Sequence, residues 1–176
     1  MDKIAIIIRG PPGTGKTTVI KELERVLFDK YHIKCELEIL DRFDFKEEQR
    51  NNRKYINLKN ILSRDPQCIL IELAWGDGAT SKPNEWVELL RQKGFKIFLF
   101  RLTATKKDIE ERVRKRYEET REGPTVASAL EIYDWYESKK CFIDFPKNCG
   151  LDKIVLNTSD LKLNDVVKHI LDIILS

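Results

Sequence analysis

Residues 10–17 read GPPGTGKT and match the pattern G-x-x-x-x-G-K-[ST]. They follow a β-branched apolar run of strand length and precede apolar residues that recur at the spacing of one helix face. Glycines let the backbone curl around an anion, so that successive N–H groups point inward at the positive end of a helix dipole. This Walker A stretch therefore predicts a P-loop that binds the phosphates of a nucleotide.

Lys16 and Thr17 give the loop its expected chemistry. Lys16 would reach the β- and γ-phosphates as a mobile charge, and the Thr17 hydroxyl would bind Mg²⁺. We expect Lys16 to face solvent before nucleotide binds. A turn that merely starts a helix would explain the glycines but not a Lys-Thr pair at this offset. The nucleotide, expected to be ATP, should contact Pro12, Gly13, Thr14, Gly15, Lys16, Thr17 and Thr18.

Strand and helix patterns alternate along the whole chain. This alternation predicts a three-layer α/β/α sandwich around a five-stranded parallel sheet, with ligands at the carboxyl ends of the strands. We expect one P-loop kinase domain over residues 1–176, with a helical lid at about 106–140. The expected strands cover 3–9, 35–40, 68–74, 95–102 and 153–156. The expected helices follow the P-loop and cover 46–63, the stretch from Pro83 to Gly94, 105–120, 126–140 and the end of the chain around 166–174.

Composition indicates a soluble globular protein. The chain has 176 residues, of which 41% are hydrophobic and 35% charged, and its net charge of +3 permits an anionic substrate without demanding nucleic acid. No apolar run reaches the length of a membrane span, and the chain enters its first strand at once, so we expect no signal peptide and a cytoplasmic location. The four cysteines form no C-x-x-C pair, which argues against zinc and favours reduced thiols at Cys35, Cys68, Cys141 and Cys149. The oligomeric state stays open.

Acidic residues directly follow the second expected strand. A kinase that acts on an alcohol needs a carboxylate to orient the hydroxyl and accept its proton. Asp41 is the better candidate because it is nearest the strand end, Asp44 is the reserve, and Arg42 lies between them. The alternative is that both acids only cap the next helix.

Two further residues at the end of the third expected strand are candidates for the acceptor site. Glu72 lies in an otherwise apolar run, where a carboxylate is costly unless it has a partner such as Lys16, a Mg²⁺-bound water or a substrate hydroxyl. An outward-facing position at the strand end is the alternative. Trp75 would stack on a substrate ring, although packing explains such an aromatic equally well.

Arg112 and Arg116 are four residues apart and share one helix face, just before a Gly123-Pro124 break. Arginines on a mobile lid can neutralise charge on the transferring phosphoryl group. The alternative is a solvated basic helix with glutamate partners. Asn157 and Thr158 follow the last strand, where their loop would either read the adenine edge or only cap a helix.

These residues together resemble those of the P-loop small-molecule and nucleotide kinases. The most similar are the compact enzymes that include adenylylsulfate kinase, chloramphenicol phosphotransferase, zeta-toxin-like kinases and the kinase module of polynucleotide kinase. The resemblance spans nearly the whole chain and implies a general base after the second strand, with lid arginines on the ATP phosphates or the adenine face. The family often has an arginine three residues after the second acid and an Asp in the third strand. Here no arginine follows Asp44 at that spacing, and Glu72 replaces the Asp, which leaves the acceptor open.

Other P-loop classes fit less well. The spelling GPPGTGKT is also frequent in AAA+ ATPases, but residues 71–74 lack the acidic pair and the chain is too short for the extra helical domain. A GTP-dependent switch would need an N-K-x-D motif, which is not found. The favoured function is an ATP- and Mg²⁺-dependent kinase for a hydroxyl or phosphate of a small molecule, a nucleotide or a polynucleotide end. A basic segment with Arg50, Arg53 and Lys54 would grip such an anionic acceptor or simply be solvated.

Overall fold

A five-stranded parallel sheet forms the centre of the molecule. The computed structural model describes residues 2–39, 57–73, 83–121, 123–138, 150–151 and 154–176. The strands lie in the order β2-β3-β1-β4-β5, and every neighbouring pair is parallel, as the sequence predicted. Their bounds are β1 Lys3–Arg9, β2 Cys35–Glu38, β3 Cys68–Leu73, β4 Phe95–Thr103 and β5 Ile154–Asn157.

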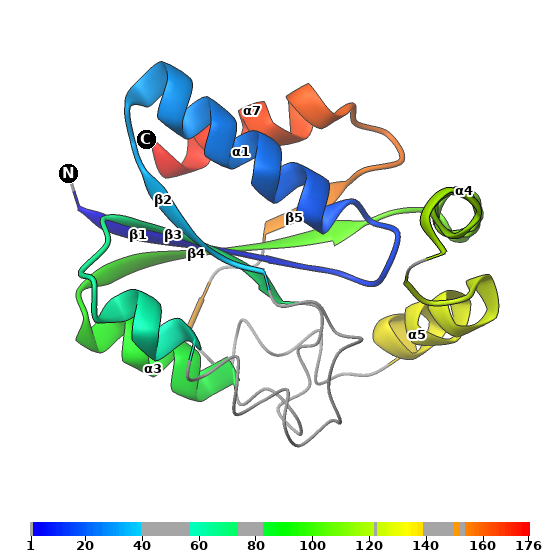
Figure 1. Ribbon diagram of the computed structural model, residues 1–176, viewed down its shortest axis with the longest axis horizontal. Helices are drawn as coiled ribbons and strands as arrows, with labels where there is room; N and C mark the ends of the chain where they lie inside the picture. Colours follow the sequence, from blue (N-terminus) through cyan, green and yellow to red (C-terminus); the bar gives the residue numbers. More distant parts are fainter. Residues whose placement is uncertain (1, 40–56, 74–82, 122, 139–149, 152–153) are drawn as a thin grey trace.

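Helices cover both faces of this sheet (Figure 1). In that view α1 and α7 lie above it and α3 lies below, which gives the three-layer α/β/α sandwich predicted from the alternating pattern. The helices are α1 Lys16–Tyr31, α3 Pro83–Gln92, α4 Lys106–Thr120, α5 Val126–Ser138 and α7 Leu163–Ile174. Residues 57–62 are also helical; the rest of the helix expected over 46–63 falls outside the described residues.

The sheet separates two hydrophobic cores. Side chains alternate between the faces of a strand, so Ile6 and Ile8 of β1 pack with α1 and α7, whereas Ala5 and Ile7 pack with α3. Burial on both faces explains why the inner strands are continuously apolar in sequence. Apart from Lys3 and Lys96 at the amino ends of β1 and β4, the charged residues of these strands lie toward the carboxyl ends, at Arg9, Glu72 and Arg101.

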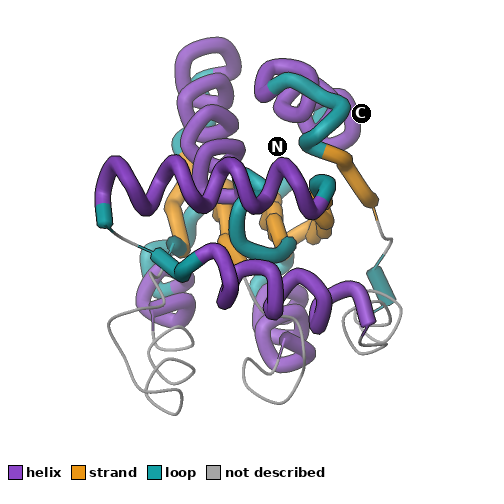
Figure 2. The backbone as a smooth tube through the Cα atoms, turned by 90° about the vertical axis from the view of Figure 1, so that its right-hand side faces the viewer, coloured by secondary structure: helices purple, strands orange, loops and turns teal. Residues whose placement is uncertain are grey.

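Two further helices lie across the carboxyl edge of the sheet. Figure 2 is turned so that this edge faces the viewer, with α4 and α5 in front of the strands. A small separate core joins the two helices and includes Ile109, Val113 and Ala129. Thr105 caps α4 by accepting a hydrogen bond from the Asp108 N–H, as its spacing predicted.

The cysteine prediction was wrong for two of the four residues. Cys35 and Cys68 form a disulfide between β2 and β3. They are directly opposite in the strand register, with their Cα atoms 4.5 Å apart, which lies within the range for a bridge. The positions are 33 residues apart in sequence, so only the strand pairing reveals their proximity. Cys141 and Cys149 lie outside the described residues.

The second strand also ends earlier than expected, at Glu38 instead of residue 40. Among the described helices, none combines the length and the apolar character that crossing a membrane requires.

Candidate active site

The P-loop links β1 to α1 at the carboxyl edge of the sheet. Gly13 and Gly15 have φ angles of 83° and 84°, a left-handed backbone that favours glycine. The Thr14 hydroxyl is buried inside the turn and donates to the Pro11 carbonyl at 2.8 Å. This curled backbone in front of the α1 N-terminus is the arrangement that binds phosphate groups.

Lys16 does not face solvent, contrary to the expectation from sequence. Its side chain is only 5% exposed, and its ammonium group donates to the Pro11 carbonyl at 3.1 Å. The loop's own backbone therefore binds the lysine where a phosphate would otherwise hold it. To reach a nucleotide, Lys16 must exchange this carbonyl for a phosphate oxygen.

Thr17 and Glu72 meet on the α1 face of the sheet. The Thr17 hydroxyl donates to Glu72 Oε2 at 2.7 Å, and Glu72 Oε1 lies 3.9 Å from the Lys16 ammonium. Glu72 thus has partners on the P-loop, and the alternative of an outward-facing strand-end residue is wrong. Hydroxyl and carboxylate oxygens are the ligands that Mg²⁺ prefers.

This oxygen pair fits a magnesium ion only in part. Among the described residues, no three His, Cys, Asp or Glu side chains are grouped so as to hold a metal. Mg²⁺ commonly keeps several waters and binds through one or two protein groups plus substrate phosphates. Thr17 and Glu72 are therefore suited to an ion that arrives with a nucleotide.

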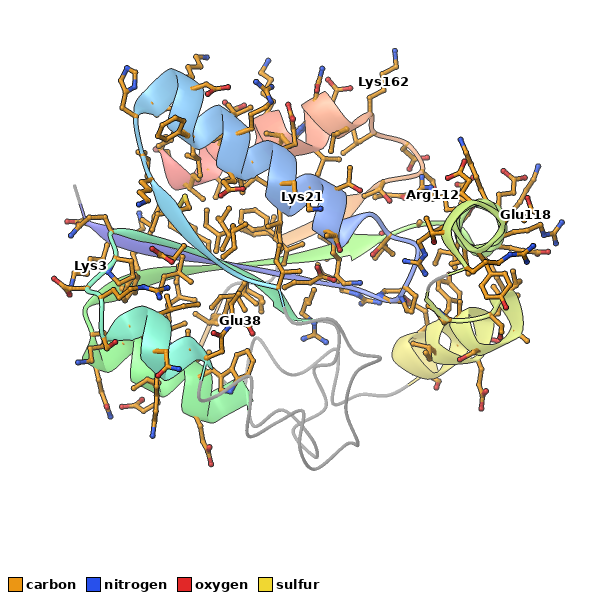
Figure 3. The ribbon with its side chains drawn as sticks, in the orientation of Figure 1. Lys3, Lys21, Glu38, Arg112, Glu118 and Lys162 are labelled. Atoms are coloured by element: carbon orange, nitrogen blue, oxygen red, sulfur yellow. A yellow bond between two sulfur atoms is a disulfide. The ribbon has the colours of Figure 1, made fainter. Side chains whose placement is uncertain are left out.

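Arg112 connects three segments, namely α4, the P-loop and the loop after β5. One of its guanidinium nitrogens donates to the Gly13 carbonyl at 3.2 Å and to the Thr158 hydroxyl at 2.9 Å. The other donates to the Thr158 carbonyl at 2.7 Å. Figure 3 shows this side chain between α4 and the loop that follows β5. The loop after β5 and the P-loop thus share one guanidinium and lie side by side.

The first turn of α4 is tied to the same loop. Hydrogen bonds from the Ser159 hydroxyl, and then from the Thr105 hydroxyl, hold the pKa of the Asp108 carboxyl below its usual value. The Ser159 hydroxyl also accepts the Thr105 N–H at 2.8 Å. Asn157 shapes the turn by accepting the Ser159 N–H at 3.0 Å and donating to Asp160 at 2.6 Å. Residues 157–160 therefore both anchor the first turn of α4 and determine the shape of the loop after β5.

The P-loop also packs directly against α4. A Cβ atom built on Gly13 would lie 3.2 Å from the side chains of both Ile109 and Val113, whereas one built on Gly15 would meet nothing within 4 Å. The absence of a side chain at Gly13 is thus what lets α4 approach the P-loop turn.

Two other residues predicted to contact the nucleotide differ in burial. Pro12 is buried in the P-loop, and Thr18 is exposed on α1.

Arg116 takes a different place from Arg112, although both lie on one helix. Its guanidinium rests against the backbone of Gly123, where an added Cβ would come within 3.0 Å of three guanidinium atoms. The side chain therefore packs on the turn between α4 and α5. Only Arg112 of the predicted arginine pair contacts the P-loop in this structure.

Four predicted site residues lie outside the described residues: Asp41, Arg42, Asp44 and Trp75. Their roles stay predictions. Three charged residues that received no role from sequence are buried near the same edge, namely Arg9, Glu38 and Arg101. In the sequence, each of these three residues could have been recognised as a charge at or near the end of an expected strand.

Solved structures of low sequence identity share this fold. Neither a protein-family model nor a curated protein sequence matches the chain. Shikimate kinase from Bacteroides thetaiotaomicron is 14% identical, with 98% of this chain and 99% of that chain covered at a TM-score of 0.57. The tunicamycin resistance protein of Deinococcus radiodurans is 15% identical, with coverages of 98% and 95% and a TM-score of 0.59. A proposed kinase from Chloroflexus aurantiacus is 16% identical, with coverages of 99% and 97% and a TM-score of 0.57. The chain therefore has a P-loop kinase-like fold, without a specific family being shown.

Proposed function

We propose that this protein is an ATP-dependent kinase that transfers the γ-phosphoryl group to a hydroxyl or phosphate of an acceptor molecule. The observation that carries the proposal is the group formed by Lys16, Thr17 and Glu72. It combines a buried ammonium group, a hydroxyl and a carboxylate beside a backbone turn that is shaped for phosphates. The kinase-like fold supports the same conclusion.

Each residue of the group has a distinct task in this function. Lys16 leaves the Pro11 carbonyl and neutralises charge on the β- and γ-phosphates as the bond to the leaving oxygen lengthens. The Thr17 hydroxyl, with Glu72 behind it, would hold Mg²⁺, which supplies further positive charge to the phosphates when bound. Glu72 also fixes the orientation of the Thr17 hydroxyl.

The remaining nucleotide contacts fall to the segments that Arg112 joins. Asn157 and Thr158 in the loop after β5 are the proposed adenine contacts, which is supported by the position of this loop beside the P-loop, where Arg112 bonds to both. Asp41 is the proposed general base for an alcohol acceptor, with Asp44 as the reserve. Arg42 and Trp75 are proposed acceptor contacts. Arg116 is proposed to reach the phosphates when the α4–α5 lid closes.

A labelled-ATP screen tests the proposal. Protein, Mg²⁺ and γ-labelled ATP are incubated with nucleosides, nucleotides, sugars, small alcohols and 5′-hydroxyl oligonucleotides, and the transfer of label to each is measured. Lys16→Ala should abolish transfer, by about three orders of magnitude or more, because charge stabilisation dominates phosphoryl transfer. Lys21→Ala is the matched control, since Lys21 is exposed on the same helix (Figure 3).

The same screen distinguishes a mechanical ATPase. A kinase whose lid excludes water should hydrolyse ATP slowly when no acceptor is present, and should consume ATP much faster when its acceptor is added. Strong hydrolysis that ignores every acceptor and rises cooperatively with protein concentration would reject the kinase in favour of an oligomeric ATPase. Near-normal turnover of Lys16→Ala would reject both.

A further inference from the structure

The peptide group between Gly13 and Thr14 lies in the middle of the P-loop and is bonded from outside the loop. Its carbonyl oxygen, which belongs to Gly13, accepts a hydrogen bond from Arg112 of α4 at 3.2 Å. Helix α4 lies on the outer side of the bend that leads from β1 to α1 (Figure 1). The Gly13 carbonyl therefore points out of the loop, toward α4.

The direction of this carbonyl determines the direction of the Thr14 N–H. The described residues contain no cis peptide bond, and in a planar trans peptide the C=O and the N–H point in opposite directions. The Thr14 N–H therefore points away from α4, toward the inside of the turn. Gly13 and Gly15, on either side of Thr14, have the left-handed backbone with which successive N–H groups line an anion site. The Thr14 N–H is thus oriented to donate to a phosphate oxygen.

Glycine at position 13 does not by itself fix the orientation of this peptide. Glycine adopts positive and negative φ angles about equally readily, so the chain has little intrinsic preference for one direction of the peptide plane. Rotation of the peptide by half a turn would present the carbonyl oxygen to the phosphate, which repels it, in place of the N–H. The hydrogen bond from Arg112 opposes that rotation.

Arg112 is itself fixed relative to the sheet. Its guanidinium donates to the Thr158 hydroxyl at 2.9 Å and to the Thr158 carbonyl at 2.7 Å. The Thr158 N–H in turn donates to the carbonyl of Thr103, the last residue of β4, at 2.8 Å. A planar guanidinium has several donors in a rigid fork, so it can bond two segments at once with little freedom left. A chain of hydrogen bonds thus runs from the end of β4 to the Gly13 carbonyl.

The charge of Arg112 also affects the donor strength of this peptide. A cation that donates to a carbonyl oxygen polarises the whole peptide group, and hydrogen bonds in such a chain strengthen one another. The N–H on the other side of the peptide then becomes a better donor to an anion. Arg112 can therefore assist phosphate binding without touching a phosphate.

We propose that Arg112 is a positioning residue of the phosphate site. It holds the Gly13 carbonyl so that the Thr14 N–H of the same peptide faces the bound phosphates, and its charge strengthens that donor. The guanidinium keeps its bond to Gly13 when the phosphates bind, in contrast to an arginine that leaves its place to contact them directly. The proposal rests on the proposed function for the kind of ligand, a nucleotide triphosphate chain, and adds how the P-loop is prepared for it.

A single NMR signal reports on this peptide. A glycine is followed by a threonine only once in the chain, at positions 13 and 14. Protein labelled with ¹³C at glycine carbonyls and with ¹⁵N at threonines therefore gives one cross-peak in an experiment that correlates a carbonyl carbon with the next amide. Loss of the hydrogen bond in Arg112→Ala should move the Gly13 carbonyl carbon upfield. Addition of tripolyphosphate to the unaltered protein should move the Thr14 amide proton downfield and leave the carbonyl carbon nearly unchanged.

Calorimetric titration with Mg²⁺ and tripolyphosphate measures the effect on binding. This ligand has no base, so a contact between a base and the loop after β5 cannot contribute. Arg112→Ala should weaken its binding about tenfold or more, because a charge-assisted hydrogen bond from the Thr14 N–H is impaired. Arg112→Lys keeps the charge and serves if the alanine variant fails to fold; it should still weaken binding about threefold or more, because lysine lacks the fork that bonds Gly13 and Thr158 together.

Arg114→Ala is the matched control. Arg114 is an exposed arginine of the same helix whose guanidinium pairs with Glu110. Its loss should change neither tripolyphosphate binding nor the cross-peak. A purely structural role of Arg112 in holding α4 predicts that folded Arg112 variants bind tripolyphosphate as the unaltered protein does, and that result would overturn the proposal.

Two other results would also overturn it. One is that the unaltered protein does not bind tripolyphosphate. The other is that the Gly13 carbonyl carbon moves on tripolyphosphate binding to its position in Arg112→Ala, because the guanidinium would then have left Gly13 to contact the phosphates itself. The kinase function is decided separately by transfer of label from ATP. Binding that depends on Arg112 in a protein that transfers label to no acceptor would reject the kinase and support the positioning role.

Discussion

Alanine at Gly13 and at Gly15 should have different effects, although the two glycines have nearly the same φ angle. Their φ angles are 83° and 84°, so an added side chain costs each about 1–2 kcal/mol. At Gly15 that is the whole cost, because a new Cβ meets nothing within 4 Å. At Gly13 the new Cβ comes within 3.2 Å of Ile109 and Val113, and overpacking of this kind adds about 1–3 kcal/mol. We therefore expect Gly13→Ala to lower the free energy of unfolding by about 2–5 kcal/mol and Gly15→Ala by about 1–2 kcal/mol.

The measurement is urea unfolding followed by circular dichroism, without nucleotide, so that phosphate binding does not contribute. Each kcal/mol should also shift Tm by about 2–4 °C in a chain of this size. Val113→Ala provides an internal control, because it removes one of the two contacting side chains. The extra cost at Gly13 should shrink in the Gly13→Ala/Val113→Ala double variant. Equal destabilisation at the two glycines would show that α4 does not pack on the P-loop, and the reasoning would be refuted.

Three further predictions concern the proposed base Asp41, the lid residue Arg116 and the Cys35–Cys68 disulfide. Asp41→Asn should lower kcat by about 10²–10⁴-fold with little change in ATP binding, because asparagine cannot take the proton; if Asp44→Asn has this effect instead, the base assignment moves to Asp44. Arg116→Ala should depress transfer equally at every protein concentration, since the arginine acts within its own chain; a loss that wild-type protein rescues by co-assembly would contradict this. Reduction of the Cys35–Cys68 bridge should lower the free energy of unfolding by about 4 kcal/mol, measured in urea with and without reductant, because it frees a long loop in the unfolded chain; a Cys35→Ser protein should lose the sensitivity to reductant.

The sequence predicted the fold well because its signals are local and repeated. Apolar runs of strand length, the Thr105 cap and the alternation of strands with helices each depend on a few adjacent residues. Together these signals predicted a parallel five-stranded sheet and left few alternative folds. The P-loop was equally clear, because its chemistry is contained in eight consecutive positions.

The rest of the site could not be predicted from local pattern. Sequence spacing placed Arg112 and Arg116 on one face, but it could not show that only Arg112 reaches the Gly13 carbonyl. The buried position of Lys16 depends on its own loop folding back toward it. The pairing of Cys35 with Cys68 depends on strand register, which is a property of the assembled sheet.

The position of β1 in the middle of the sheet has a consequence for the order in which the protein folds. β1 is synthesised before both of its partners, β3 and β4, with which it pairs through Ile4–Cys68 and Lys3–Phe95. Gly13 then packs on α4, which is made later still. Pairings between such distant segments are slow, because long loops must close before any contact forms. The P-loop is therefore synthesised well before the strands and the helix that pack against it, and until those segments emerge the apolar side chains of β1 stay exposed to non-native contacts.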